Sequence, residues 1–153
     1  MVNIRDGGVY RFETLDGLIA SYDRGQFVPG AELAVRNYEQ LGGEYESRFV
    51  AKSVPGDKWK FTLLHDPSVC LGFLGSPFDD PVLSTVRDDG AAHTEWSVDH
   101  GSGEHESLIH AEVDSDDVAW TVPDRGVSGL PILLTGQNGS PGQQWKVGIP
   151  IDD

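Results

Sequence analysis

The sequence predicts an all-β fold built from three similar units. Three aromatic residues, Phe49, Trp96 and Trp145, recur at intervals of 47 and 49 residues. Apolar runs are short, rich in β-branched and aromatic residues, and separated by Gly, Pro, Asp and Asn, which is the pattern of strands and turns. No window keeps a helical period over three turns, and the best helical candidate is the short stretch 31–38.

The apolar runs sort into four predicted strands per unit. The first three strands of each unit centre on Phe12, Ile19 and Ala34, then on Phe61, Leu71 and Leu83, then on Ile109, Ala119 and Ile132. The fourth strands are expected to end at Phe49, Trp96 and Trp145. Twelve strands in three pseudo-repeats of about 48 residues indicate a β-trefoil, in which six strands close a barrel and three hairpins cover one end.

Barrel closure explains why three units are needed. Each unit has an apolar face that it cannot bury alone, and closure also removes exposed strand edges. We therefore expect one domain over residues 1–153, with units at approximately 6–55, 56–104 and 105–153. The three recurring aromatics are predicted to fill the barrel, together with Tyr10, Phe12, Trp59 and Phe61.

Composition excludes several classes of function. Lys and Arg number 11 against 25 Asp and Glu, a formal net charge of −14, so nucleic acid and membrane are not expected partners. The N-terminus has no apolar signal region, and we expect a cytoplasmic monomer without a signal peptide that could be released on tissue damage. The single cysteine, Cys70, excludes an intrachain disulfide and is predicted to be a small buried residue.

Motifs for catalysis or cofactor binding are lacking in the sequence. No nucleophile elbow, phosphate-binding loop or dinucleotide fingerprint occurs, so we expect no enzyme activity and no cofactor. His93, His100, His105 and His110 cluster in sequence, but His100 and His105 flank a Gly-rich loop. They are predicted to be solvated loop residues rather than metal ligands.

The loops between second and third strands differ among the units. Asp-Arg-Gly occurs at residues 23–25 in the first unit and at 124–126 in the third, whereas 75–81 in the second has no arginine. An arginine on a rigid loop is what the S1 pocket of a trypsin-type protease accepts, opposite a buried carboxylate. The alternative is ordinary turn chemistry, in which Asp bonds the backbone and Gly takes a positive φ.

The whole chain resembles the fungal β-trefoil protease inhibitors of the mycospin group, the cospin-like serine protease inhibitors. The resemblance rests on the opening residues 6–12 (DGGVYRF), the closing residues 143–147 (QQWKV), the length and the acidic composition without disulfides. It implies inhibition of trypsin-like serine proteases by a loop inserted into their active site. The implied loop comprises Asp23, Arg24, Gly25, Gln26 and Phe27, with Arg24 as the P1 residue.

Two further residues are secondary candidates for protease contact. Arg125 repeats the Asp-Arg-Gly motif in the third unit. Asn138, followed by Gly139, would suit an asparagine-specific protease, although Asn-Gly is also a common turn pair.

Two other functions remain open. Ricin-B-type lectins place an aspartate and an aromatic beside a Gln-x-Trp strand in each unit, but here Ser47 and Thr94 replace two of the three glutamines. An exposed tryptophan such as Trp120 would favour that alternative. The opening motif also resembles the clitocypin-type cysteine protease inhibitors, which would place function at the turn 14–17 and the loop 40–44.

Overall fold

The computed structural model describes residues 4–25, 30–74, 82–101, 106–113, 115–122 and 128–148, with the side chain of His100 excepted. Over these ranges the fold is all-β, as predicted. The strands are β1 (Val9–Thr14), β2 (Ile19–Asp23), β3 (Ala34–Arg36), β4 (Tyr45–Glu46), β5 (Phe49–Val54), β6 (Lys58–Leu63), β7 (Asp66–Gly72), β8 (Ser84–Arg87), β9 (Ser97–His100), β10 (Ser107–Val113), β11 (Asp116–Thr121), β12 (Leu133–Gly136) and β13 (Trp145–Gly148). A short helix, α1 (Tyr38–Leu41), and a 3-10 turn, η1 (Pro141–Gln143), complete the described elements.

Six strands close a barrel in the order β1, β5, β6, β9, β10 and β13. Five of the six junctions are antiparallel ladders, and β6 meets β9 through a bridge between Trp59 and Trp96. Closure leaves no free edge in this ring of strands, which protects it from pairing with other chains. The expected barrel of a β-trefoil is therefore present.

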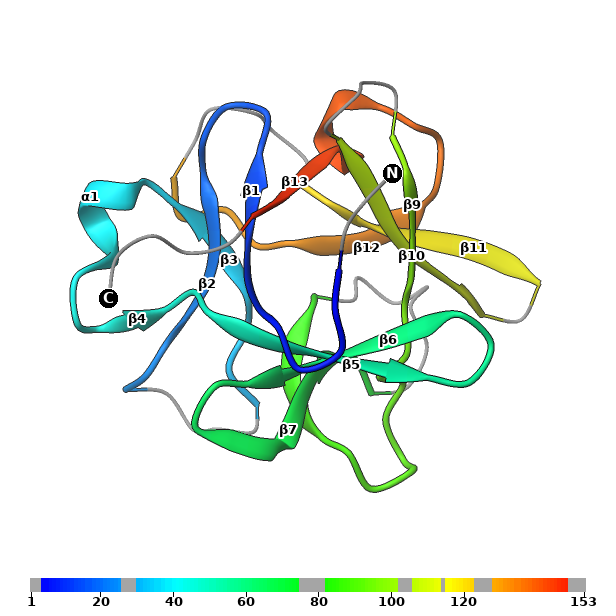
Figure 1. The fold of residues 1–153 in the computed structure, drawn as a ribbon. Helices are drawn as coiled ribbons and strands as arrows, with labels where there is room; N and C mark the ends of the chain where they lie inside the picture. The colour runs from blue at the N-terminus through cyan, green and yellow to red at the C-terminus, as the bar shows by residue number, and fades with distance from the viewer. Residues whose placement is uncertain are drawn as a thin grey trace.

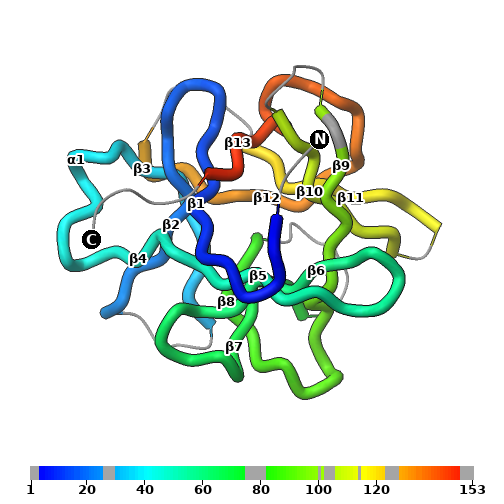
Figure 2. Tube along the Cα trace, in the orientation of Figure 1, coloured from blue at the N-terminus to red at the C-terminus, as the bar shows by residue number. Residues whose placement is uncertain are grey.

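Three hairpins cover one end of the barrel, β2–β3, β7–β8 and β11–β12. Isolated bridges join them in a triangle: Glu32 to Ser84, Val82 to Leu133 and Ala34 to Pro131. Figure 1 shows the three units as lobes around a common centre, blue to cyan on the left, green at the bottom and yellow to red at the upper right, and the trace in Figure 2 follows the same arrangement.

The predicted position of the recurring aromatics on their strands was wrong. Phe49 and Trp145 begin β5 and β13 rather than ending a strand, and Trp96 directly precedes β9. In the first unit, the Glu46 carboxylate accepts hydrogen bonds from the backbone N–H of Ser47 and Arg48, which takes these residues out of a ladder. The extra two-residue strand β4 before this break raises the number from the twelve predicted strands to thirteen.

The core lies where the barrel meets the hairpins. Phe49, Trp96 and Trp145 are fully buried, as predicted, and Trp120 joins them at 0% exposure. Cys70 is also fully buried, and burial raises the pKa of its thiol to about 11. The predicted core is confirmed for Tyr10, Phe12 and Phe61, whereas Trp59 is only partly buried and packs against the core from outside; Trp120 is an addition.

The helical candidate at 31–38 was misplaced. Those residues hold β3, and α1 begins only at Tyr38. Gly42 ends α1 with a φ of 41°, a conformation that suits glycine and turns the chain back toward β4. At four residues, α1 is too short to cross a membrane, and no helix among the described residues is long and apolar enough to do so.

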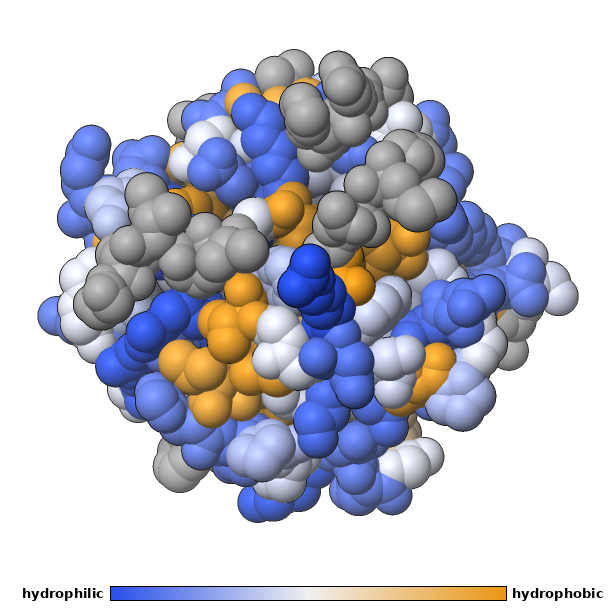
Figure 3. Space-filling view, in the orientation of Figure 1, coloured by the Kyte–Doolittle hydropathy of each residue, from blue (hydrophilic) through white to orange (hydrophobic). Residues whose placement is uncertain are grey.

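The face of the molecule turned to the viewer in Figure 3 is largely hydrophilic, with apolar residues gathered in separate patches. Among the described residues, the large hydrophobic side chains that stay exposed are Tyr38 and Leu74. Isolated exposed apolar residues are normal on a protein surface. Tyr38 differs because it lines a pocket.

Candidate functional site

An open pocket of about 370 Å³ lies in the first unit. It is within the size range of small-molecule sites, which is roughly 300–1,000 Å³. The lining residues are Arg11, Arg24, Tyr38, Leu41, Gly42, Gly43, Tyr45, Glu46, Ser47 and Arg48. We refer to this as the first-unit pocket.

Three segments distant in sequence bring the charged side chains of the pocket together. Strand β1 alternates, so Tyr10, Phe12 and Thr14 are buried while Arg11 points out of the core. Strand β2 pairs with β4 in a register that sets Tyr22 opposite Glu46 and Asp23 opposite Tyr45. Arg24 follows β2 directly, and its backbone N–H donates to the Glu44 carbonyl at 2.9 Å.

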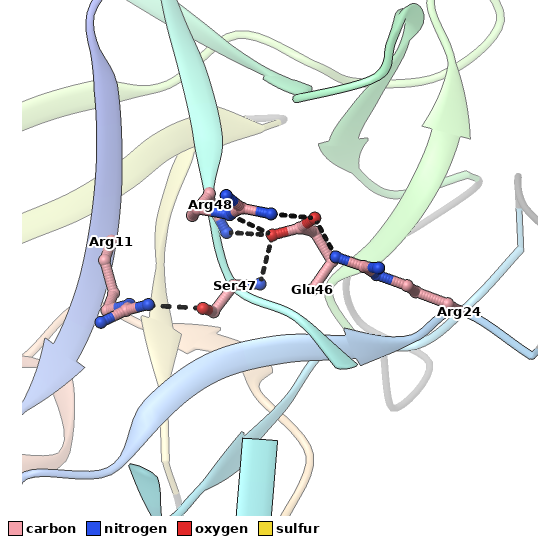
Figure 4. A network of polar contacts seen from close by, with 5 residues as sticks. All are labelled: Arg11, Arg24, Glu46, Ser47 and Arg48. Atoms are coloured by element: carbon pink, nitrogen blue, oxygen red, sulfur yellow. Dashed lines mark hydrogen bonds and ion pairs between the residues drawn. The ribbon is translucent and has the colours of Figure 1, made fainter. Parts of the chain in front are cut away.

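A buried carboxylate organises the pocket. Glu46 is 2% exposed, and its Oε1 accepts from Nη2 of Arg24 at 2.6 Å and from Nη2 of Arg48 at 3.2 Å. Its Oε2 accepts from Nε of Arg48 at 2.9 Å. Figure 4 shows Glu46 between the two guanidinium groups, with Arg11 donating to Oγ of Ser47 nearby. Each carboxylate oxygen is satisfied, which is what burial of a charge requires.

The ionisation of Glu46 reflects two opposing effects. Burial disfavours the charged form, but hydrogen bonds from Arg48 and the charges of Arg48 and Arg24 together outweigh it. The pKa of Glu46 is therefore held below its ordinary value. The carboxylate stays charged at neutral pH and orients both arginines.

Two tyrosines give the pocket aromatic surface. Tyr38 is 54% exposed, and Cζ of Arg11 lies 5.5 Å from the centroid of its ring. The ring of Tyr45 lies under Arg36, with Cζ 4.1 Å from the centroid. Both distances are in the range of cation–π contacts. These contacts hold the rings at the pocket while Tyr38 remains accessible to a ligand.

The pocket is positively charged in an acidic protein. Three arginines and one glutamate line it, a formal charge of +2 where the whole chain carries −14. Chemically, such a site can hydrogen-bond planar or anionic groups and stack a flat apolar surface on Tyr38.

The residues of the predicted protease-binding loop lie partly in this site. Asp23 ends β2, and its Oδ1 accepts from the N–H of Gly25 at 2.8 Å, which is the aspartate part of the turn chemistry that the sequence allowed as an alternative. Gly25 does not take the positive φ that this alternative included. Arg24 lines the pocket and is 44% exposed, with its guanidinium paired to Glu46. Gln26 and Phe27 lie outside the described residues, as does Arg125.

Asn138 lies at an exposed turn far from the first-unit pocket in sequence. Its Oδ1 accepts from the N–H of Ser140, and Gly139 has a φ of 72°, again as expected of an Asn-Gly turn. Gln143 is fully buried, and its Oε1 fixes this loop by accepting hydrogen bonds from the backbone N–H groups of Asn138 and Gly139. The glutamine of Gln143-Gln144-Trp145 thus has a structural role in this chain.

Trp120 is not exposed, so it does not favour the lectin alternative. Its side chain is 0% exposed and contacts Phe12, Phe61, Trp96 and Trp145 in the core. Among the described residues, the exposed aromatic side chain is that of Tyr38.

A second pocket, of about 520 Å³, lies in the third unit. Asp116 and Asp117 line it together with Val118, Leu134 and the segment 135–137. Its lining holds no aromatic side chain and has a formal charge of −2, the opposite sign to the first-unit pocket.

Asp117 also belongs to a charged cluster across three strands. His110 on β10 has Nδ1 2.7 Å from Oδ1 of Asp117 and Nε2 2.5 Å from Oδ2 of Asp99. Both ring nitrogens can donate only in the imidazolium form. Burial lowers the pKa of His110, but the hydrogen bonds and charges of the two carboxylates outweigh it and raise the pKa above its ordinary value.

This cluster predicts a pH dependence of stability. Because the pKa of His110 is higher in the folded state, its contribution is fully present below about pH 6.5 and is lost as the pH rises through the folded value. Asp99 is 63% exposed, so water screens the pair and we expect only about 0.5–1 kcal/mol. In urea unfolding, His110→Gln should cost more stability at pH 6 than at pH 9, and Asp99→Asn should do the same to a smaller extent. Equal losses at both pH values would contradict this prediction.

Among the described residues, no group of three His, Cys, Asp or Glu side chains is arranged to hold a metal ion. His93 stacks on Phe73 and contacts the Glu95 carbonyl through Nε2 at 2.9 Å. His105 lies outside the described residues, and of His100 only the backbone, in β9, is described.

Sequence reasoning missed most of the first-unit pocket, including Arg11, Tyr38, Glu46 and Arg48. One signal was available. Five of the seven arginines fall within the first 48 residues of the chain, at positions 5, 11, 24, 36 and 48. Such a concentration in an acidic chain indicates a local site. The identity of the buried acid among 25 Asp and Glu had no comparable signal.

Comparisons with known proteins establish the fold. No family model and no curated protein matches the sequence. Among solved structures, the designed threefold symmetric protein ThreeFoil has a TM-score of 0.77 at 16% identity, covering 92% of this chain and 98% of that one. The Macrolepiota procera ricin B-like lectin in complex with lactose has a TM-score of 0.74 at 18% identity, covering 97% and 100%.

A mosquitocidal holotoxin has a TM-score of 0.77 at 12% identity and covers 97% of this chain, which spans only 18% of the toxin's length. The neighbours are thus β-trefoil proteins that include a lectin and a toxin. At these identities the similarity shows the fold alone.

Proposed function

We propose that this protein binds carbohydrate and that the first-unit pocket is its binding site. The observation that carries the proposal is the accessible ring of Tyr38 beside a set of planar polar side chains held by Glu46. Sugars present an apolar face of C–H groups and an edge of hydroxyls. A half-exposed aromatic ring matches the face, and guanidinium and hydroxyl groups match the edge.

The location of the first-unit pocket beside the strand that carries Phe49 also supports the proposal. An aspartate and an aromatic beside the strand of the recurring aromatic are the elements expected of a ricin-B-type site. Here Asp23 ends β2, Tyr38 begins α1, and Phe49 begins β5. The chain departs from that pattern because Asp23 bonds its own turn and Arg24 faces the pocket in its place. A lectin with the same fold binds lactose.

Glycan-array binding of the intact protein, repeated with Tyr38→Ala, tests this function. We expect wild type to bind a defined subset of glycans and Tyr38→Ala to lose about tenfold or more in affinity, because an aromatic anchor contributes much of the binding energy of a small site. Tyr38→Phe keeps the ring and should retain most of the affinity. Leu74→Ala removes an exposed hydrophobic side chain of the second unit and should change nothing. Binding that survives in Tyr38→Ala would contradict the site.

Serine protease inhibition is the second candidate, and one observation favours it. Arg24 directly follows β2, is 44% exposed, and has its backbone anchored to Glu44. A residue whose backbone is anchored in this way would lose little entropy on docking to a protease. Entry into an S1 pocket would require the ion pair with Glu46 to break. A trypsin assay decides: inhibition by wild type that disappears in Arg24→Ala supports this candidate, and no inhibition by wild type removes it.

A further inference from the structure

We propose that the saccharide preferred by the first-unit pocket carries a carboxylate, as uronic and sialic acids do, and that Arg24 is the residue that recognises it. This inference rests on the proposed carbohydrate binding and adds the chemical class of the ligand. It follows from the charge of the pocket, the donors of Arg24 and the orientation that Glu46 imposes on it.

The charge of the lining selects for an anion. Three arginines surround the pocket, and Glu46 is the acidic residue among its lining residues. Binding of a neutral sugar does not require an excess of positive charge in the pocket. The rest of the protein is negatively charged, with a net charge of −14, and its electrostatic field opposes anion binding. At physiological ionic strength that field is screened beyond about 8 Å, so the local arginines dominate inside the pocket.

Arg24 has donors to offer. A guanidinium group has five N–H donors. Among the described residues, this group makes one hydrogen bond, from Nη2 to Oε1 of Glu46 at 2.6 Å. The described residues therefore leave four donors of Arg24 unused, on a side chain that is 44% exposed at the pocket. The Glu46 contact uses one of the two N–H groups of Nη2, and the other N–H of Nη2 forms with its neighbouring donor, Nε or Nη1, the fork that binds a carboxylate through two parallel hydrogen bonds.

Glu46 fixes the direction of Arg24 before the ligand arrives. The carboxylate is buried and is also held by Arg48 and by the backbone N–H of Ser47. An arginine held on one side by such an anchor loses less conformational entropy when it binds a second carboxylate on the other side. Arg24 would thus be shared between a buried internal carboxylate and the carboxylate of the ligand.

Tyr38 explains why the ligand is an acidic sugar rather than a simple anion. A phosphate or acetate ion would use the arginines and leave the exposed ring unused. A sugar ring with one carboxylate uses both, with its apolar face on Tyr38 and its charge on Arg24. The net charge of −14 would repel an extended polyanion, so a single acidic residue on a short glycan fits best.

Isothermal titration with methyl β-glucuronide, methyl β-glucoside and acetate tests the proposal at low and high salt. We expect the glucuronide to bind at least about tenfold more tightly than the glucoside, with an affinity that falls as salt rises. Acetate should bind weakly or not measurably. Arg24→Gln should remove the preference, because it should lower the affinity for the glucuronide about tenfold more than the affinity for the glucoside. Arg87→Gln, an exposed arginine of the second unit, serves as the matched control and should behave as wild type.

The outcomes separate this inference from the function on which it rests. If wild type binds neither sugar here and no glycan on the array, the proposed function fails. If wild type binds glycans but favours the glucoside, or if Arg24→Gln keeps the preference for the glucuronide, carbohydrate binding stands and the acidic ligand is wrong. Acetate that binds as tightly as the glucuronide would also overturn the inference, because the sugar ring would then contribute nothing.

Discussion

Replacement of Trp120 by alanine is expected to lower the free energy of unfolding by about 3–5 kcal/mol, the usual cost of deleting a fully buried tryptophan. The Trp120 ring is 0% exposed and lies 5.1 Å from the ring of Phe12, 5.5 Å from Trp96 and 6.0 Å from Trp145, measured between centroids. These partners come from all three units, so one cavity would loosen the packing of each unit on the others. Urea unfolding followed by tryptophan fluorescence and far-UV circular dichroism measures the loss.

A matched pair of milder variants tests the same account. The Nε1 of Trp120 is buried and has no hydrogen-bond partner among the described residues, whereas that of Trp96 donates to the Leu71 carbonyl at 3.0 Å. Trp96→Phe therefore leaves a buried carbonyl without this donor, while Trp120→Phe removes an unsatisfied donor. We expect Trp120→Phe to be the less destabilising of the two. The reverse order would show that the packing of Trp120 has been misjudged.

The second large effect is expected at Glu46. Removal of one partner of a buried ion pair costs about 3–5 kcal/mol when the charge left behind is fully buried. Arg24 and Arg48 are 44% and 30% exposed, so water can solvate them in part and we expect Glu46→Ala to cost about 2–3 kcal/mol. Glu46→Gln keeps the shape and one acceptor oxygen and should cost less. The measurement is urea unfolding at pH 7.

The same residue predicts an acid transition. Because the pKa of Glu46 is lowered by folding, its contribution is present above about pH 4.5 and is lost as the pH falls through the folded value. The difference in stability between wild type and Glu46→Gln should therefore shrink between pH 5 and pH 3. A constant difference over this range would mean that the carboxylate charge does not stabilise the first unit.

The fold could be predicted from the sequence because a threefold repeat is a global pattern. A period near 48 residues and strands of β-branched and aromatic residues leave few architectures, and barrel closure then places Phe49, Trp96 and Trp145 in the core. Strand boundaries were less predictable. The break before Phe49 depends on the Glu46 side chain bonding to the backbone, a local competition that hydropathy does not reveal.

The site was only partly predictable, for a physical reason. Arg24 was found because arginine is rare in this chain and stands in a loop motif. Its partner Glu46 is 22 residues away, and only the register of β2 against β4 brings the two side chains together. The cluster of Asp99, His110 and Asp117 likewise depends on the register of three strands. Such pairings are set by tertiary structure and leave no pattern along the sequence.

The most direct test of the first-unit pocket as a saccharide site is a titration of ¹⁵N-labelled protein with methyl β-glucuronide, followed by amide chemical shifts. The account predicts saturable shifts that cluster at Arg24, Tyr38, Gly42, Gly43 and Tyr45, the segments that line the pocket. Shifts confined to the acidic pocket at residues 116–118 and 134–137, or no saturable shifts at all, would contradict it.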